Sequence, residues 1–130
     1  MAKPVFEKLE IHKHKRIVVL NSPSEYNELV EILDPGFYFS SKLEKNESFI
    51  HYFAAFQAEL EWDFSMLKSA LSKQGILWTS WPKDKSKLPK DLNENNIRDT
   101  GLAGGLLDVN FCAVDEDWSV LKFVYRLKDR

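Results

Sequence analysis

The sequence has little cysteine, no marked excess of charge and no long apolar run, and each absence excludes a class of protein. Its single cysteine, Cys112, cannot form an intramolecular disulfide, so a reducing compartment is expected. No uninterrupted apolar run approaches the roughly 20 residues that a membrane-spanning helix needs. Residues 1–15 carry scattered charges instead of the apolar stretch of a secretory signal. By elimination, we expect a soluble cytoplasmic protein.

The charge balance also bears on partners. The formal net charge of −2 gives no general reason to expect a nucleic acid or an anionic membrane as partner. An unknown protein or a small anionic ligand remains as the expected kind of partner.

Glycine is absent where nucleotide-binding folds use it most, directly after the first strand. The β-branched run RIVVL at residues 16–20 is followed by Asn-Ser-Pro-Ser at 21–24. The chain also lacks a Walker turn, a Ser-x-Gly nucleophile elbow and an HExxH helix. His12 and His14 would share one face of an extended segment, but no third metal ligand lies near them in sequence. We therefore predict no catalytic residue, no metal site and no cofactor.

What is present fits one globular domain. The 130 residues are 44% hydrophobic and 13% aromatic, which is enough for a core without disulfides or metals. We expect a single domain over residues 1–130, with an N-terminal extension at 1–14 and an α/β core at 15–130.

Hydrophobic periodicity and turn signals divide the chain into six strands and three helices. Ser22 and Glu25 form a capping-box pattern that begins the first helix, and Asp91 with Glu94 begins the third. Gly75 is the residue expected just beyond the second helix. The strands are predicted at 16–20, 37–40, 48–55, 76–81, 107–114 and 119–127, and a helix follows the first, third and fourth of them.

This order, β-α-β-β-α-β-α-β-β, predicts a mainly parallel six-stranded sheet with helices on both faces, a single three-layer α/β domain. The last two strands form an antiparallel hairpin. From about residue 15 onward, the layout resembles the methyltransferase-like variant of the Rossmann-type fold. The resemblance implies the spatial strand order 2-1-3-4-6-5.

A second resemblance lies in the C-terminal two-fifths of the chain. Three segments are similar to a family of small bacterial proteins classed as a domain of unknown function: GILWTSWPK at 75–83, DLNENNIRDTGL at 91–102 and FCAVDEDWSVLKFVYRL at 111–127. The family pattern has glycine where Val120 stands, and a basic and a smaller residue where Asn110 and Phe111 stand. The resemblance implies a fold and no reaction.

Open α/β sheets bind ligands at the carboxyl ends of their strands, where the strand order reverses. In the predicted topology, this crevice lies between the first and third strands. It would be lined by Asn21 and Ser22 on one side and by Phe56 and Gln57 on the other. Free N–H groups at the helix start, Ser22–Glu25, are a candidate anion site. The simpler interpretation is that Ser22 and Glu25 only cap each other.

The methyltransferase resemblance implies two features that the sequence lacks. It implies a glycine-rich turn after the first strand and an acid at the end of the second strand to hold ribose hydroxyls. The second strand ends instead in Ser40-Ser41-Lys42, and a lysine ammonium accepts no hydrogen bond. We therefore do not expect S-adenosylmethionine to bind in the usual manner.

Trp81 and Lys83 follow the fourth strand at its carboxyl end, and further lysines lie in the same loop. One interpretation is an aromatic and cationic stacking surface for a nucleotide or another planar anion. The alternative, which the near-neutral charge favours, makes Trp78 a core residue, Trp81 a cover over the sheet edge and the lysines a solvated loop.

Our first hypothesis is a non-catalytic binding or interaction module on a methyltransferase-like fold. The alternative is an enzyme or a nucleotide- or anion-binding protein, including a divergent S-adenosylmethionine-dependent methyltransferase, that uses Asn21, Ser22, Trp81 and Lys83.

A third possibility is homo-oligomerisation through the C-terminal hairpin, whose outer strand has an open edge. Three basic residues are expected to hinder pairing at this edge: Lys122, Arg126 and Lys128.

Overall fold

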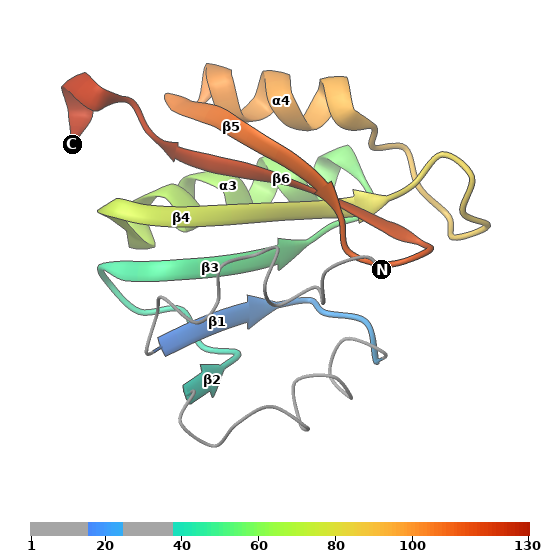
Figure 1. Ribbon diagram of the computed structural model, residues 1–130, viewed down its shortest axis with the longest axis horizontal. Coiled ribbons are helices and arrows are strands. Elements are labelled where there is room, and N and C mark those ends of the chain that lie inside the picture. Colours follow the sequence, from blue (N-terminus) through green and yellow to red (C-terminus); the bar gives the residue numbers. More distant parts are fainter. Residues whose placement is uncertain (1–15, 25–37) are drawn as a thin grey trace.

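The computed structural model describes residues 16–24 and 38–130 of the chain. Figure 1 shows a twisted sheet with helices behind it. The described strands are β1 (Arg16–Leu20), β2 (Tyr38–Ser40), β3 (Glu47–Phe53), β4 (Leu71–Pro82), β5 (Leu106–Ala113) and β6 (Trp118–Tyr125); the described helices are α3 (Gln57–Ala70), α4 (Glu94–Ala103) and the short 3-10 helix η2 (Leu127–Asp129).

The six strands form one sheet in the order β2-β1-β3-β4-β6-β5, which confirms the predicted order. β2, β1, β3 and β4 are mutually parallel, and β6 runs antiparallel to β4 and β5. The predicted class, a mainly parallel six-stranded α/β sheet that ends in an antiparallel hairpin, is therefore confirmed. The first predicted helix lies, from residue 25 onward, outside the described residues.

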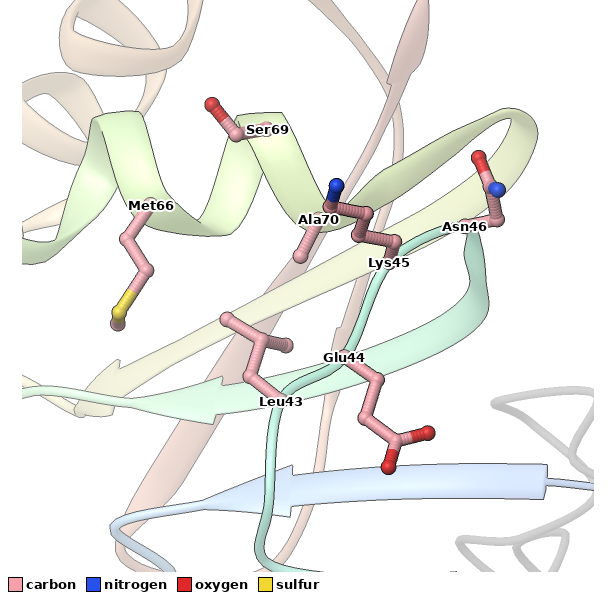
Figure 2. A pocket seen from close by; sticks show the side chains of 7 residues that line it. All are labelled: Leu43, Glu44, Lys45, Asn46, Met66, Ser69 and Ala70. Carbon is pink, nitrogen blue, oxygen red and sulfur yellow. The ribbon is translucent and has the colours of Figure 1, made fainter.

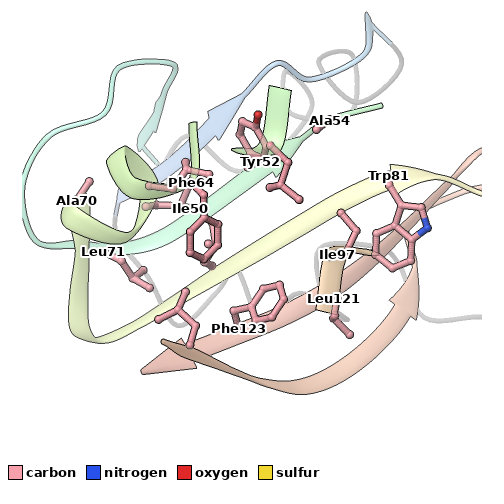
Figure 3. Close-up of a cluster of buried hydrophobic side chains, with 14 of the residues drawn as sticks. Ile50, Tyr52, Ala54, Phe64, Ala70, Leu71, Trp81, Ile97, Leu121 and Phe123 are labelled. Carbon is pink, nitrogen blue, oxygen red and sulfur yellow. The ribbon is translucent and has the colours of Figure 1, made fainter. Parts of the chain in front are cut away.

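The core under α3 and α4 comes from the alternation of side chains along the strands. Phe64 and Leu67 of α3 pack onto side chains such as Ile50 of β3, and Ile97 of α4 packs near Phe123 of β6 (Figure 3). α3 and α4 therefore bury their apolar faces against the same face of the sheet.

The opposite face of the sheet carries a second apolar cluster. Trp78 is fully buried there, as predicted for a core residue, together with Phe49, Phe53 and Val120. The Lys122 ammonium lies 5.6 Å from the centre of the Trp78 ring, a cation–π contact.

The prediction that Gly75 ends the second helix is wrong. α3 ends at Ala70, and β4 begins at the next residue, Leu71. Leu71 pairs with Glu47, yet Ile76 pairs with Phe49, so the residues between them form an irregularity in β4. A Cβ at Gly75 would lie 2.7 Å from the Glu47 carbonyl oxygen. Glycine is therefore needed for close backbone approach, and sequence alone does not separate this need from a helix end.

A charged pair joins the amino ends of β1 and β3. Glu47 is only 3% exposed, and its Oε1 accepts a hydrogen bond from Arg16 Nε at 2.9 Å. Its Oε2 accepts from the Glu44 backbone N–H at 2.8 Å and from Arg16 Nη2 at 3.2 Å. The buried carboxylate is thus held by both charge and hydrogen bonds.

Arg16→Met is expected to lower the free energy of unfolding by roughly 2–3 kcal/mol, because Glu47 would keep a buried charge without its partner. Urea unfolding at neutral pH measures the loss. Arg98→Met is the matched control, since the partners of Arg98, Glu94 and Asp108, are 46% and 24% exposed. The control should lose less than about 1 kcal/mol. Equal losses in the two variants would contradict the role given to Glu47.

Candidate ligand site at the carboxyl ends of the strands

The carboxyl ends of β1, β3 and β4 meet at one edge of the sheet, on the right in Figure 1. The strand order reverses between β1 and β3, because β2 lies beyond β1 and β4 lies beyond β3. Crevices at such switch points are where open α/β sheets bind ligands. The predicted position of the crevice therefore matches the observed topology.

Asn21 follows β1 directly and has a left-handed backbone, with φ of 59°. It is exposed, and Ser22 beside it is partly exposed. Asparagine adopts this conformation more readily than other non-glycine residues. The turn after β1 thus contains the left-handed backbone that glycine commonly supplies, although no glycine is present. The absence of glycine from this turn does not reveal its left-handed backbone. The sequence signal for that conformation is an asparagine directly after a buried strand.

The N-terminus of α3, on the other side of the crevice, is occupied by two carboxylates. Glu59 Oε1 accepts from the backbone N–H groups of Ala55 and Phe56, each at 3.2 Å. Asp91 Oδ1 accepts from the Gln57 N–H at 2.6 Å. Because these acceptors take the N–H groups that an anion would need, the start of α3 is a poor phosphate site.

Asp91 therefore has a different role from the predicted one. Asn93, not Asp91, caps α4, since its side chain accepts from the Asn96 N–H at 2.9 Å. Asp91 caps α3 instead, and its own N–H donates to the Ala55 carbonyl at 3.0 Å. The prediction that Asp91 begins the third helix is wrong because its true partner lies 34 residues away in sequence.

The side chain of Gln57 is bound to α4, whereas the ring of Phe56 is exposed at the start of α3. The Gln57 amide donates to Thr100 Oγ1 of α4 and to Glu61 Oε1, both at 3.0 Å, so its side chain joins two helices. Its Oε1 is buried and has no hydrogen-bond partner. Phe56 is 40% exposed and offers apolar surface at the start of α3.

Trp81 and Lys83 lie together at the end of β4. They line a small pocket of about 130 Å³ with four other residues: Asp84, Glu94, Phe111 and Ser119. Trp81 is only 3% exposed, and its ring centre lies 6.0 Å from that of Phe111. Asn21 does not line this pocket. The pocket is too small for a nucleotide, so the predicted stacking surface at Trp81 is not supported.

The loop after β4 is held by its own polar groups. Lys90 Nζ donates to the Ser86 carbonyl at 2.8 Å, and Ser86 Oγ donates to Asp117 Oδ1 at 2.9 Å. Lys85 and Lys87 are exposed. The lysines therefore behave mainly as a solvated loop, as the alternative interpretation had it.

Two buried titratable groups lie near the site. Tyr52 donates to Asp63 Oδ2 at 2.6 Å, and burial, with this hydrogen bond, raises its pKa above the ordinary value. His51 is fully buried, and its Nε2 lies 2.7 Å from Ser80 Oγ. Burial lowers the pKa of His51 from 6.5 to about 3. His51 is thus a core residue with a hydrogen-bond partner, as predicted.

Across residues 16–24 and 38–130, no group of three or more His, Cys, Asp and Glu side chains is placed to hold a metal ion. His12 and His14 lie outside this range. The helices within it are too short or too polar to cross a membrane.

No protein-family model and no curated protein matches the chain. Solved structures do match. A protein assigned as a type 11 methyltransferase from Sulfolobus solfataricus superposes with a TM-score of 0.55 over 93% of this chain and 89% of its own, at 11% identity. This chain has a methyltransferase-like fold.

Two further structures agree in fold. A LepI variant in complex with SAH and a substrate analogue has a TM-score of 0.56 and 10% identity over 94% of this chain, which spans 39% of LepI. The PH0226 protein from Pyrococcus horikoshii OT3 has a TM-score of 0.50 and 12% identity over 85% of this chain and 72% of its own. At these identities the likeness concerns the fold alone.

Proposed function

We propose that the chain is a divergent S-adenosylmethionine-binding protein of the methyltransferase class, with its ligand in the crevice between β1 and β3. The observation that carries the proposal is the left-handed Asn21 at the switch point, in a fold shared with a type 11 methyltransferase. The left-handed turn reverses the chain directly after β1 and leaves Asn21 exposed beside the switch point. This favours the enzyme-class alternative over a purely structural module.

The charges around the crevice favour this ligand over a nucleotide phosphate. Glu59 and Asp91 place two carboxylates at the start of α3. Carboxylates repel phosphate and attract the sulfonium and ammonium groups of S-adenosylmethionine. These residues fit the cofactor, although β2 ends without the usual acid.

The cofactor, when bound, supplies an electrophilic methyl group. The chain's own residues would bind and orient it: the Asn21 backbone, the Ser22 hydroxyl and the exposed Phe56 ring. His51 is buried against the sheet with a pKa of about 3, so it supplies no general base at the crevice. We therefore assign binding residues and no catalytic residue.

A non-catalytic interaction module is the second candidate. The observation that favours it is the end of β2, where Ser40 Oγ accepts from the Lys42 N–H at 3.0 Å and the next two residues, Ser41 and Lys42, carry no carboxylate. A domain of this kind would bind a protein partner or a ligand without transferring a methyl group.

Thermal-shift measurements separate these possibilities. S-adenosylmethionine or S-adenosylhomocysteine, at about 100 times its dissociation constant, should stabilise the protein by roughly 2.7 kcal/mol and raise Tm by several degrees. ATP and inorganic phosphate should give no shift. A shift with ATP alone, or with no compound, would contradict the proposal.

Asn21→Val is expected to weaken binding of S-adenosylhomocysteine at least about tenfold, because a β-branched residue disfavours the left-handed turn. Isothermal titration calorimetry measures the affinity. Asn46→Val is the matched control: Asn46 has φ of 58° but lies in the β2–β3 loop, at the other edge of the sheet. Both variants should lose similar stability, and only Asn21→Val should lose affinity. Equal affinities in the two variants would place the ligand elsewhere.

A further inference from the structure

The solvent-facing side of α3 carries an uncharged stripe. Trp62 is 86% exposed and Met66 is 50% exposed, one turn apart on the same face. Three small exposed residues lie on the same face, Ala58, Ser65 and Ser69, and the exposed side chains of Glu59 and Glu61 border it. We call the five uncharged residues the α3 stripe. Solvent-facing helix surfaces are normally charged, and a large exposed tryptophan is enriched at protein interfaces.

A hollow of about 400 Å³ opens beside the C-terminal half of α3 (Figure 2). Met66 and Ala70 of the helix and Leu43 of the β2–β3 loop form its apolar walls, and Lys45 adds an ammonium group. Its volume falls in the range of pockets that hold small organic molecules, so it accommodates an indole ring. The full lining is Leu43, Glu44, Lys45, Asn46, Met66, Ser69 and Ala70.

The exposed tryptophan and the hollow are related by simple helix geometry. Trp62 and Ala70 are eight residues apart, about 12 Å along the axis, and Met66 lies midway between them. A twofold axis through Met66, perpendicular to α3, would therefore carry Trp62 of one copy onto the hollow of a second copy. The same axis brings the two Met66 side chains together.

We infer that α3 is the interface of a symmetric dimer, in which Trp62 of each copy fills the hollow of the other. The two helices run antiparallel, so Glu59, near the N-terminus of one α3, faces the end of the other where Lys45 lies. Lys45 also offers a cation to the incoming indole ring. A twofold interface must be self-complementary. The α3 stripe and the hollow beside α3 lie on one surface of the chain and meet this requirement.

The edge of β5 is the competing candidate for a dimer interface. It belongs to the C-terminal hairpin, for which the sequence predicts possible homo-oligomerisation. Leu107, Val109 and Phe111 are 40%, 47% and 48% exposed there. This surface shows exposed apolar groups and an open edge, and the pocket that Phe111 lines, about 130 Å³, is smaller than the hollow of about 400 Å³ beside α3. Two of the basic residues predicted to hinder pairing at this edge have other contacts. Lys122 lies over the Trp78 ring, and Arg126 donates to the Leu102 backbone carbonyl.

Sedimentation velocity on the full chain, from about 1 to 200 µM, tests the inference. The wild type should form a dimer, and Trp62→Ala should raise the dissociation constant at least about thirtyfold, as expected for a central tryptophan. Leu127→Ala, which removes another highly exposed apolar side chain (79%), should leave the dimer unchanged. Unchanged far-UV circular dichroism spectra would show that each variant folds.

Two outcomes would overturn the inference: a monomer at 200 µM, and a dimer that survives Trp62→Ala. If Val109→Lys disrupts that surviving dimer, the interface lies at the β5 edge instead. Met66→Cys in a Cys112→Ser background gives an independent measure. Oxidation should link two copies through position 66, because a twofold axis at this residue brings the cysteines within disulfide distance. Ala103→Cys, on exposed α4 surface, should stay monomeric on a non-reducing gel.

Discussion

Lowering the pH from 7.5 to 4.5 is expected to remove roughly 3 kcal/mol from the free energy of unfolding through His51 alone. The native state keeps this imidazole neutral, because burial lowers its pKa from 6.5 to about 3. The unfolded chain binds a proton below about pH 6.5, whereas the native state does so only near pH 3. The stabilisation is therefore complete above pH 6.5 and is lost, at about 1.4 kcal/mol per unit, as the pH falls toward 3.

Urea unfolding at half-unit pH steps measures this dependence. His51→Gln removes the titrating group and keeps an amide for Ser80, whose Oγ lies 2.7 Å from His51 Nε2. The variant should be less stable at pH 7.5, but its stability should fall much less between pH 6.5 and 4.5. A slope in the variant equal to that of the wild type would assign the acid sensitivity to other groups.

Gly101→Val is expected to destabilise the protein by roughly 3 kcal/mol. Gly101 is buried in α4, and a Cβ there would lie 2.1 Å from Cε1 of the Phe123 ring. Overpacking a buried site forces side-chain and backbone shifts, and here the obstacle is a rigid ring in the core. Ala103→Val, on the exposed side of the same helix, should cost less than about 1 kcal/mol.

Adding the substitution Phe123→Leu to Gly101→Val tests whether a clash with the Phe123 ring causes this loss of stability. Leucine is smaller and more adaptable, so it should accept the extra methyl groups at position 101. A double-mutant cycle measured by urea unfolding gives the coupling between the two positions. The double variant should lose less free energy of unfolding than the two single variants together, by about 1 kcal/mol or more. Additive losses would mean that the clash with Phe123 is not what limits position 101.

Much of the fold was predictable because it depends on local patterns. The β-branched run at 16–20 and the alternation in 119–127 identify strands on their own. The resemblance to the methyltransferase-like fold implies the strand order 2-1-3-4-6-5, which the sheet shows. Boundaries set by tertiary contact were not predictable. Gly75 is needed because the Glu47 carbonyl passes 2.7 Å from where its Cβ would be, a contact that no local pattern records.

The candidate site was predictable in position and less so in detail. The switch point follows from strand order, and Asn21 directly follows β1 beside it. Asp91 was misassigned because a cap can come from any segment that folds back, and its partner Gln57 is distant in sequence. Trp81 was a weak candidate because its exposure depends on packing against Phe111 in another strand.

The most direct test of the account is an amide ¹H–¹⁵N NMR titration with S-adenosylhomocysteine. We expect saturable shifts at Asn21 and Ser22 after β1 and at Ala55 and Phe56 after β3, with little change at Trp81. Shifts confined to the Trp81–Lys83 pocket, or none at millimolar ligand, would contradict a cofactor crevice between β1 and β3.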